Sequence, residues 1–105
     1  MSGLRVSPLK NPLEGTMVAP PSKYHTHRGL ILGALADGTS KVTGISKSLD
    51  NMSTLQCLTN LGAVYTPIEG GYEIKGGAFK TPANVLDCGN SGSTINFLLG
   101  VAATA

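Results

Sequence analysis

Charged residues are scarce in this chain: 8 Lys and Arg and 6 Asp and Glu make up only 13% of its 105 residues. The net charge is +2, and the basic residues form neither a cluster nor a stripe interleaved with aromatic side chains. The sequence therefore gives little support for nucleic-acid binding. Because so little of the surface is ionic, we also expect other protein to cover part of the surface of this chain.

Cysteines and long apolar runs are also few. The two cysteines, Cys57 and Cys88, form no CxxC motif, which argues against a zinc site or a disulfide scaffold. Cys57 falls in a predicted helix and is expected to be a small core residue. No apolar run approaches the ~20 residues that span a bilayer, and residues 1–10 lack the pattern of a signal peptide. These absences predict a cytoplasmic protein with no membrane contact and no metal.

The chain is rich instead in apolar residues and glycine. Hydrophobic residues make up 41% of the sequence, which argues against disorder throughout. The 14 glycines and 6 prolines predict short elements joined by many turns. At this length the chain forms one domain, or part of one, with a core of modest size.

Hydrophobic periodicity predicts alternating strands and helices. Alternating residues bounded by turn formers predict strands at 4–9, 15–19, 40–45, 63–68, 72–75 and 84–88. Apolar residues at helical spacing predict helices at 26–36, 48–62 and 93–105, the first of them buried on most sides. Glycines at 70 and 71 suit a hairpin turn, and Pro67 implies an edge position or a bulge in its strand.

This order of elements predicts an α+β fold in three segments. Residues 1–14 form an N-terminal strand and linker, and residues 15–80 form one unit. Residues 81–105 form a strand, a glycine-rich loop and a helix that repeat the beginning of that unit. We expect the chain to stop early in this second copy.

The segment SKYHTHR, residues 22–28, lies between a strand-like run and an apolar helix. It places Lys23 and Arg28 near a helix N-terminus, where the macrodipole disfavours cations. A bound anion would offset this cost, with Lys23 as a point charge and Arg28 as a bidentate fork. The alternative is that both are ordinary solvated side chains.

The aromatic and imidazole side chains of this segment allow several roles. Histidine side chains suit proton transfer near neutral pH. No third ligand accompanies His25 and His27, so they predict no metal site. One exposed and one packed histidine is the better interpretation. Tyr24 either donates a hydrogen bond to a ligand or covers the end of the helix.

A second segment, DCGNSGST at residues 87–94, holds small residues that tolerate unusual backbone angles and present N–H groups. It is neither a Walker A loop nor a GxGxxG motif. Alone it is typical of a polar turn with a helix cap; together with Lys23 and Arg28 it indicates a phosphate-binding site. Asp50, at another helix start, caps that helix, binds a sugar-like hydroxyl or orients Lys23.

These segments together resemble the N-terminal part of the 3-phosphoshikimate 1-carboxyvinyltransferases, the EPSP synthase family. The resemblance rests on PSKYHTHRGLILGALADGTS at residues 21–40, on LDCGNSGST at residues 86–94, and on residues 48–62 between them, in the same order and spacing. It covers nearly all of the chain from about Gly15 onward. A related transferase that acts on a UDP-sugar is a weaker match.

The resemblance implies one βαβαββ unit, residues 15–80, plus the first strand and helix of a second. The family transfers the enolpyruvyl group of phosphoenolpyruvate to shikimate 3-phosphate and releases phosphate, without a cofactor. In the family the first short strand, here residues 4–9, belongs to the sheet of the other domain. In this chain we expect it to be disordered, folded back as an edge strand, or paired with another copy.

The resemblance also implies substrate-binding roles. Lys23 matches the lysine that contacts the anionic groups of both substrates, and Arg28 the arginine that holds shikimate. Asp50 matches an acidic position near that lysine. Asn90 and Gly92 lie in the loop that approaches phosphoenolpyruvate.

Three residues depart from the family pattern. Tyr24 stands where a serine commonly binds the shikimate phosphate, and its ring would block or reshape that subsite. Asn96 and Phe97 stand where the family commonly has arginine and proline, so a cation of the second loop is missing.

The full enzyme is about four times longer, and its acid and base carboxylates lie beyond the aligned residues. We therefore assign no catalytic residue within this chain and expect it to be inactive alone, with weak binding of small phosphorylated substrates at most. Two other interpretations remain: a non-catalytic module that binds a phosphorylated metabolite, or a structural protein that reuses the unit and self-associates.

Overall fold

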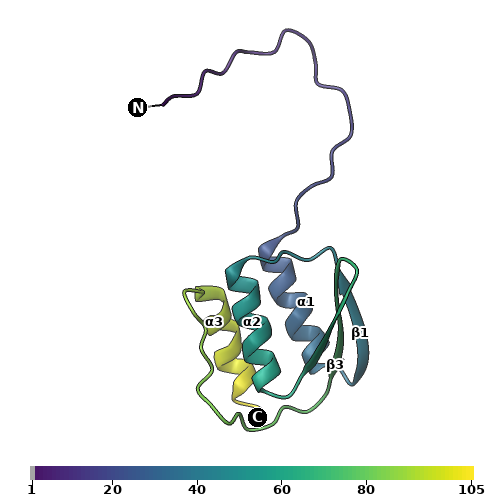
Figure 1. Ribbon diagram of the computed structural model, residues 1–105, viewed down its shortest axis with the longest axis vertical. Coiled ribbons are helices and arrows are strands. Elements are labelled where there is room, and N and C mark those ends of the chain that lie inside the picture. The colour runs from purple at the N-terminus through teal and green to yellow at the C-terminus, as the bar shows by residue number, and fades with distance from the viewer. Residues whose placement is uncertain (1) are drawn as a thin grey trace.

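The computed structural model describes residues 2–105. Three helices and three strands follow one another as α1 (Lys23–Leu35), β1 (Gly38–Thr43), α2 (Leu49–Asn60), β2 (Val64–Ile68), β3 (Gly71–Gly76) and α3 (Gly92–Ala102). The helices lie on the same side of the sheet, with α1 against it and α2 and α3 beyond α1 (Figure 1). The predicted α+β class is confirmed.

The three strands form an antiparallel sheet in the order β1-β3-β2. The hairpin between β2 and β3 turns at Gly70, whose φ of +77° is a conformation that favours glycine. Pro67 lies in β2, an edge strand of this sheet, where a missing N–H costs no ladder bond on the open side. The predicted hairpin and the edge position of Pro67 are therefore confirmed.

The core lies where α1 covers β3 and α2 covers α1. α1 packs against β1 and β3, and α3 packs against both other helices. The fully buried side chains at the centre include Leu30 of α1, Leu58 of α2 and Ile74 of β3. Cys57 is 1% exposed and belongs to this core, as the sequence predicted.

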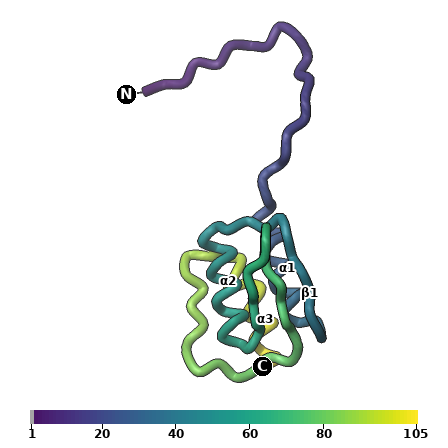
Figure 2. Tube along the Cα trace, turned by 45° about the vertical axis from the view of Figure 1, so that its right-hand side comes forward, coloured from purple at the N-terminus to yellow at the C-terminus, as the bar shows by residue number. Residues whose placement is uncertain are grey.

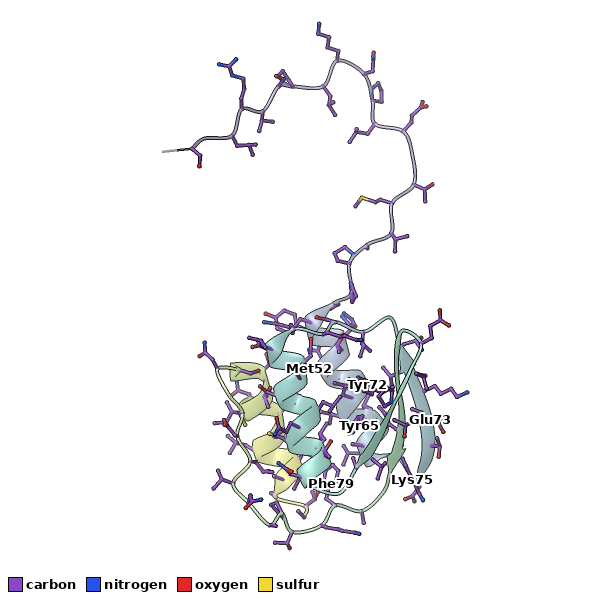
Figure 3. All side chains as sticks on the ribbon, in the orientation of Figure 1. Met52, Tyr65, Tyr72, Glu73, Lys75 and Phe79 are labelled. Carbon is purple, nitrogen blue, oxygen red and sulfur yellow. The ribbon has the colours of Figure 1, made fainter. Side chains whose placement is uncertain are left out.

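Two tyrosines of the hairpin close the core on the sheet side (Figure 3). The rings of Tyr65 and Tyr72 meet edge to face at 6.1 Å, and the Tyr65 hydroxyl donates to the Leu30 carbonyl at 3.0 Å. Burial raises the pKa of Tyr65. This hydrogen bond satisfies a polar group that would otherwise be buried without a partner.

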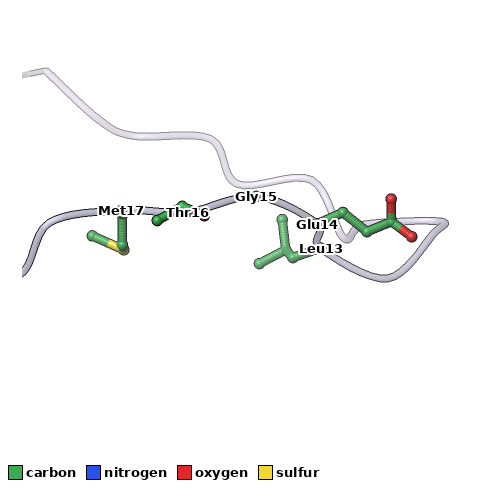
Figure 4. A pocket seen from close by; sticks show the side chains of 5 residues that line it. All are labelled: Leu13, Glu14, Gly15, Thr16 and Met17. Carbon is green, nitrogen blue, oxygen red and sulfur yellow. The ribbon is translucent and has the colours of Figure 1, made fainter.

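The segment before α1 forms no secondary structure within residues 2–22. It runs away from the helices and the sheet as an extended chain (Figures 1 and 2). The strands predicted at 4–9 and 15–19 are therefore not formed, and the unit lacks its expected first strand. Residues Leu13 to Met17 surround a hollow by themselves, with no wall from another element (Figure 4). Met1, the start of the predicted 1–14 segment, lies outside the described residues.

Three further predictions about the elements need correction. Residues 84–88 form no strand, because no strand lies alongside to pair with them, and they pass irregularly along α2 instead. α1 is buried on one side only, since Leu32 is 65% exposed and Leu35 43%. α1 also begins at Lys23 rather than at residue 26, which places Arg28 in its second turn.

Among residues 2–105, no helix is long and apolar enough to cross a membrane.

Candidate functional site

The first turns of all three helices meet at one end of the molecule. The helices run in the same direction, with their N-termini at the upper end of the folded part in Figure 1, where the extended segment joins α1. Each begins with a serine cap, Ser22, Ser48 or Ser91, whose oxygen accepts a backbone N–H three residues on. Because the positive ends of the three helix dipoles point the same way, this end of the molecule favours anions.

Lys23 and Asp50 form an ion pair between the first turns of α1 and α2. The Lys23 Nζ lies 2.9 Å from Asp50 Oδ2, and the two side chains are 39% and 29% exposed. The hydrogen bond that the ammonium donates to Asp50 raises the pKa of Lys23, which favours the charged form. Ser48 rather than Asp50 caps α2, which leaves the carboxylate free to hold Lys23.

A buried amide fixes the backbone beneath this ion pair. Asn51 is fully buried, and its Nδ2 donates to the Lys23 carbonyl at 2.9 Å. Its Oδ1 accepts from the Ser48 hydroxyl at 2.8 Å. Asn51 therefore joins the first residue of α1 to the cap of α2.

Tyr24 and Arg28 lie on the surface of α1. Tyr24 is next to Lys23, and Arg28 is next to α3. The Lys23 ammonium sits 5.2 Å from the centre of the Tyr24 ring, and Tyr24 is 56% exposed. The Arg28 guanidinium lies 5.7 Å from the centre of the Phe97 ring on α3. Lys23 therefore faces α2 while Arg28 faces α3, one turn further along α1.

The glycine-rich loop leads into α3 at this end of the molecule. Gly89 has a φ of +56°, and its N–H donates to Asp87 Oδ1 at 2.8 Å. Asn90 lines a hollow of about 420 Å³ together with Asp50 and other residues of α2. A Cβ at Gly92 would meet nothing within 4 Å, so this first residue of α3 faces open space.

The buried polar contacts behind the site were not predicted. The helix at 48–62 was expected from its apolar residues, but the polar Asn51 and Thr54 are also fully buried. His27 is 0% exposed, and the expected pair of one exposed and one packed histidine is confirmed. The signal available in the sequence was the spacing of three, four and three between residues 51, 54, 58 and 61, which continues the stripe of Leu58 and Leu61 through polar residues.

His27 should make folding stability depend on pH. Burial lowers its pKa, an effect that Lys23 and Arg28 reinforce and Asp50 opposes. Below the ordinary value near 6.5, His27 takes up a proton in the unfolded chain but resists it in the folded chain. The contribution of neutral His27 to the free energy of unfolding is therefore fully present above pH 6.5 and is lost as the pH falls. One such proton contributes a slope of at most about 1.4 kcal/mol per pH unit.

The check is denaturant unfolding between pH 7.5 and pH 5.5. We expect His27→Asn, which keeps a donor amide but cannot titrate, to flatten the profile. His25→Asn changes an exposed histidine and should retain it. An unchanged slope in His27→Asn would contradict the assignment.

Comparison with known proteins identifies the family. The model of the family described as EPSP synthase (3-phosphoshikimate 1-carboxyvinyltransferase) matches residues 9–105. This chain belongs to that family. A 3-phosphoshikimate 1-carboxyvinyltransferase of Thermosynechococcus vestitus is 40% identical over 97 residues, and one of Clostridium beijerinckii is 39% identical over 113 residues.

The matches cover most of this chain and a small part of each relative. They include 89% of the chain and 22% of the Thermosynechococcus protein, and 98% of the chain and 25% of the Clostridium protein. The EPSP synthase of Acinetobacter baumannii has the same fold over 82% of the chain and 20% of its own, with a TM-score of 0.75 and 37% identity. The chain thus spans about a fifth to a quarter of the relatives it matches.

The two α3 positions expected to depart from the family pattern differ in their surroundings. The Phe97 ring lies 5.7 Å from the Arg28 guanidinium, within the range of a cation–π contact. Asn96 is exposed. Of the cations near these helix starts, Lys23 lies in the first turn of α1 and Lys47 directly precedes the cap of α2.

Proposed function

We propose that this chain supplies the phosphate-binding face of an enolpyruvyl-transferase site, for shikimate 3-phosphate and phosphoenolpyruvate. The observation that carries the proposal is the meeting of three helix N-termini around the Lys23–Asp50 pair. Phosphorylated ligands suit such a place because backbone N–H groups, helix dipoles and an ammonium all favour negative oxygens.

In this proposal each side chain has a separate role that follows from its position. Lys23 contacts phosphate or carboxylate oxygens, while Asp50 holds its ammonium in place. Asn90 and the open backbone at Gly92 receive phosphoenolpyruvate from the α3 side. Arg28 binds the shikimate moiety beside Phe97, and Tyr24 stands where the shikimate phosphate approaches α1.

In this proposal the isolated chain binds but does not catalyse. Enolpyruvyl transfer passes through charged species that must be kept from water by groups on both sides of the reacting centre. Here Lys23 is 39% exposed at its side chain and Gly92 faces open space. The chain therefore offers one wall of a site.

The test is calorimetric titration with shikimate 3-phosphate, phosphoenolpyruvate and inorganic phosphate, beside an assay for phosphate release from both substrates together. We expect saturable binding of shikimate 3-phosphate and no turnover. Turnover would contradict inactivity of the chain. Equal binding of shikimate 3-phosphate and inorganic phosphate would favour a general phosphometabolite-binding module. Sedimentation at the same concentration shows whether self-association contributes to the heat.

A further inference from the structure

A continuous row of buried polar side chains joins the three helices behind the candidate site. His27 Nδ1 of α1 lies 2.8 Å from Thr54 Oγ1 of α2, which lies 2.7 Å from Thr94 Oγ1 of α3. Thr94 Oγ1 lies 2.6 Å from Ser91 Oγ and 3.2 Å from the Asp50 carbonyl. His27, Thr54 and Thr94 are each 0% exposed. Such a network matters for stability, because a buried polar group that loses its partner cannot form a hydrogen bond with water instead.

One direction of the hydrogens pairs the Asp50 carbonyl as well as every hydroxyl of this row. A hydroxyl has a single hydrogen and the Asp50 carbonyl can only accept, so in this arrangement Thr94 donates to that carbonyl. Thr94 then accepts from Thr54, and Thr54 accepts from His27. This arrangement puts the imidazole hydrogen on Nδ1 and leaves Nε2, which is buried without a partner, as the unprotonated nitrogen.

We propose that Thr54 is a positioning residue: through His27 and Thr94 its hydroxyl holds the start of α3 at a fixed place beside Lys23 and Asp50. Thr54 is the central member of this row, because its hydroxyl contacts both α1 and α3. Its partners adjoin the site, since His27 precedes Arg28 and Thr94 follows Gly92 by two residues. The bearing of this role on ligands rests on the proposed function.

Asp50 makes a second contact, through its backbone carbonyl, that fixes the position of α3 relative to Lys23. The carboxylate of this residue holds Lys23, and its carbonyl accepts from Thr94. The first turn of α2 therefore touches the lysine of α1 and the first turn of α3 through one residue. If Thr54 lost its hydroxyl, the 3.2 Å contact of Thr94 with the Asp50 carbonyl would be the remaining side-chain hydrogen bond from α3 to α2, and the glycine loop would shift relative to Lys23.

The test compares Thr54→Val, which removes the hydroxyl and nearly keeps the shape, with Thr54→Ser, which keeps the hydroxyl. Thr59→Val is the matched control, because Thr59 is an exposed residue of α2 whose hydroxyl bonds only the Leu55 carbonyl of its own helix. The measurements are the imidazole ¹⁵N pattern of His27, the amide shifts and hydrogen exchange of α3, and a titration with inorganic phosphate.

We expect an Nδ1-protonated His27 in the wild type, in Thr54→Ser and in Thr59→Val. In Thr54→Val the hydrogen should move to Nε2, the amides of residues 92–95 should shift and exchange faster, and phosphate should bind about tenfold more weakly. An Nε2-protonated wild-type His27 overturns the proposal even if Thr54→Val fails to fold. Unmoved α3 amides in a folded Thr54→Val also overturn it.

Failure of the proposed function is separately visible. If wild-type protein shows the Nδ1 pattern and Thr54→Val displaces α3, the positioning role stands. Absence of any saturable phosphate shift in that wild-type protein would then count against the anion site alone.

Discussion

Lys23→Ala should weaken phosphate binding by roughly 10- to 100-fold, which is what loss of one charge-assisted hydrogen bond costs. The effect has two sources. The substitution removes the ammonium that meets the anion, and it leaves the Asp50 carboxylate without its 2.9 Å partner. An unpaired carboxylate beside the three helix N-termini would itself repel phosphate. The measurement is an amide-detected phosphate titration of both proteins.

Lys75→Ala is the matched control for this prediction. Lys75 is an exposed residue of β3 and lies at the opposite end of the sheet from the helix N-termini (Figure 3). Its replacement changes the net charge by the same amount. Equal losses in Lys23→Ala and Lys75→Ala would show that phosphate responds to overall charge, and the assignment of Lys23 would then be wrong.

Gly76→Ala should destabilise the fold by about 3 kcal/mol or more, because it forces α1 away from the sheet. A Cβ at Gly76 would lie 2.5 Å from the Ala36 oxygen, 2.6 Å from the Ala34 oxygen, and closer still to the Gly33 oxygen. These are backbone atoms at the end of α1, so no side chain can rotate aside. The Gly77 N–H also donates to the Ala34 carbonyl at 3.0 Å, and this bond would be lost with the displacement.

Gly100→Ala is the control, and we expect it to change the free energy of unfolding in the opposite direction. Gly100 lies in α3, and a Cβ there would meet nothing within 4 Å. Alanine is preferred over glycine in a helix interior by about 0.5–1 kcal/mol, so this variant should be slightly more stable. Urea unfolding of both variants measures the two effects. A Gly76→Ala protein as stable as the wild type would refute the close approach of α1 to β3.

Local chemistry in the sequence was sufficient for several elements. Two glycines and an edge proline specify the β2–β3 hairpin, because each needs a particular backbone conformation or a free edge. The serine at residue 48 specifies the start of α2 through its cap. Cys57 was assignable to the core because it continues an apolar helical stripe.

Features set by tertiary contacts were not predictable in the same way. Residues 15–19 and 84–88 have strand-like patterns, but a strand forms only where a neighbour pairs with its backbone, and none lies beside them here. Thr54 and Thr94 look like surface residues of amphipathic helices. They are buried because each pairs with the other across a helix interface. Spacing within one helix can show that Thr54 shares a face with Leu58 and Leu61, but it does not identify a partner on another helix.

The candidate site was predictable in its parts and less so in its arrangement. Position near a helix start singled out Lys23 and Asp50, and orientation of Lys23 was one of the three roles expected for the Asp50 carboxylate. The separation of Lys23 and Arg28 onto different sides of α1 was not foreseen. It follows from the start of the helix at residue 23, which rotates Arg28 toward Phe97.

The most direct test of the account is an amide shift map of the wild-type chain titrated with inorganic phosphate. The central claim is that three helix N-termini form one anion site. Amides in the first turns of α1, α2 and α3 should then titrate together with a single dissociation constant, while those of the β2–β3 hairpin stay unmoved. Shifts confined to one helix, or different constants for the three first turns, would contradict it.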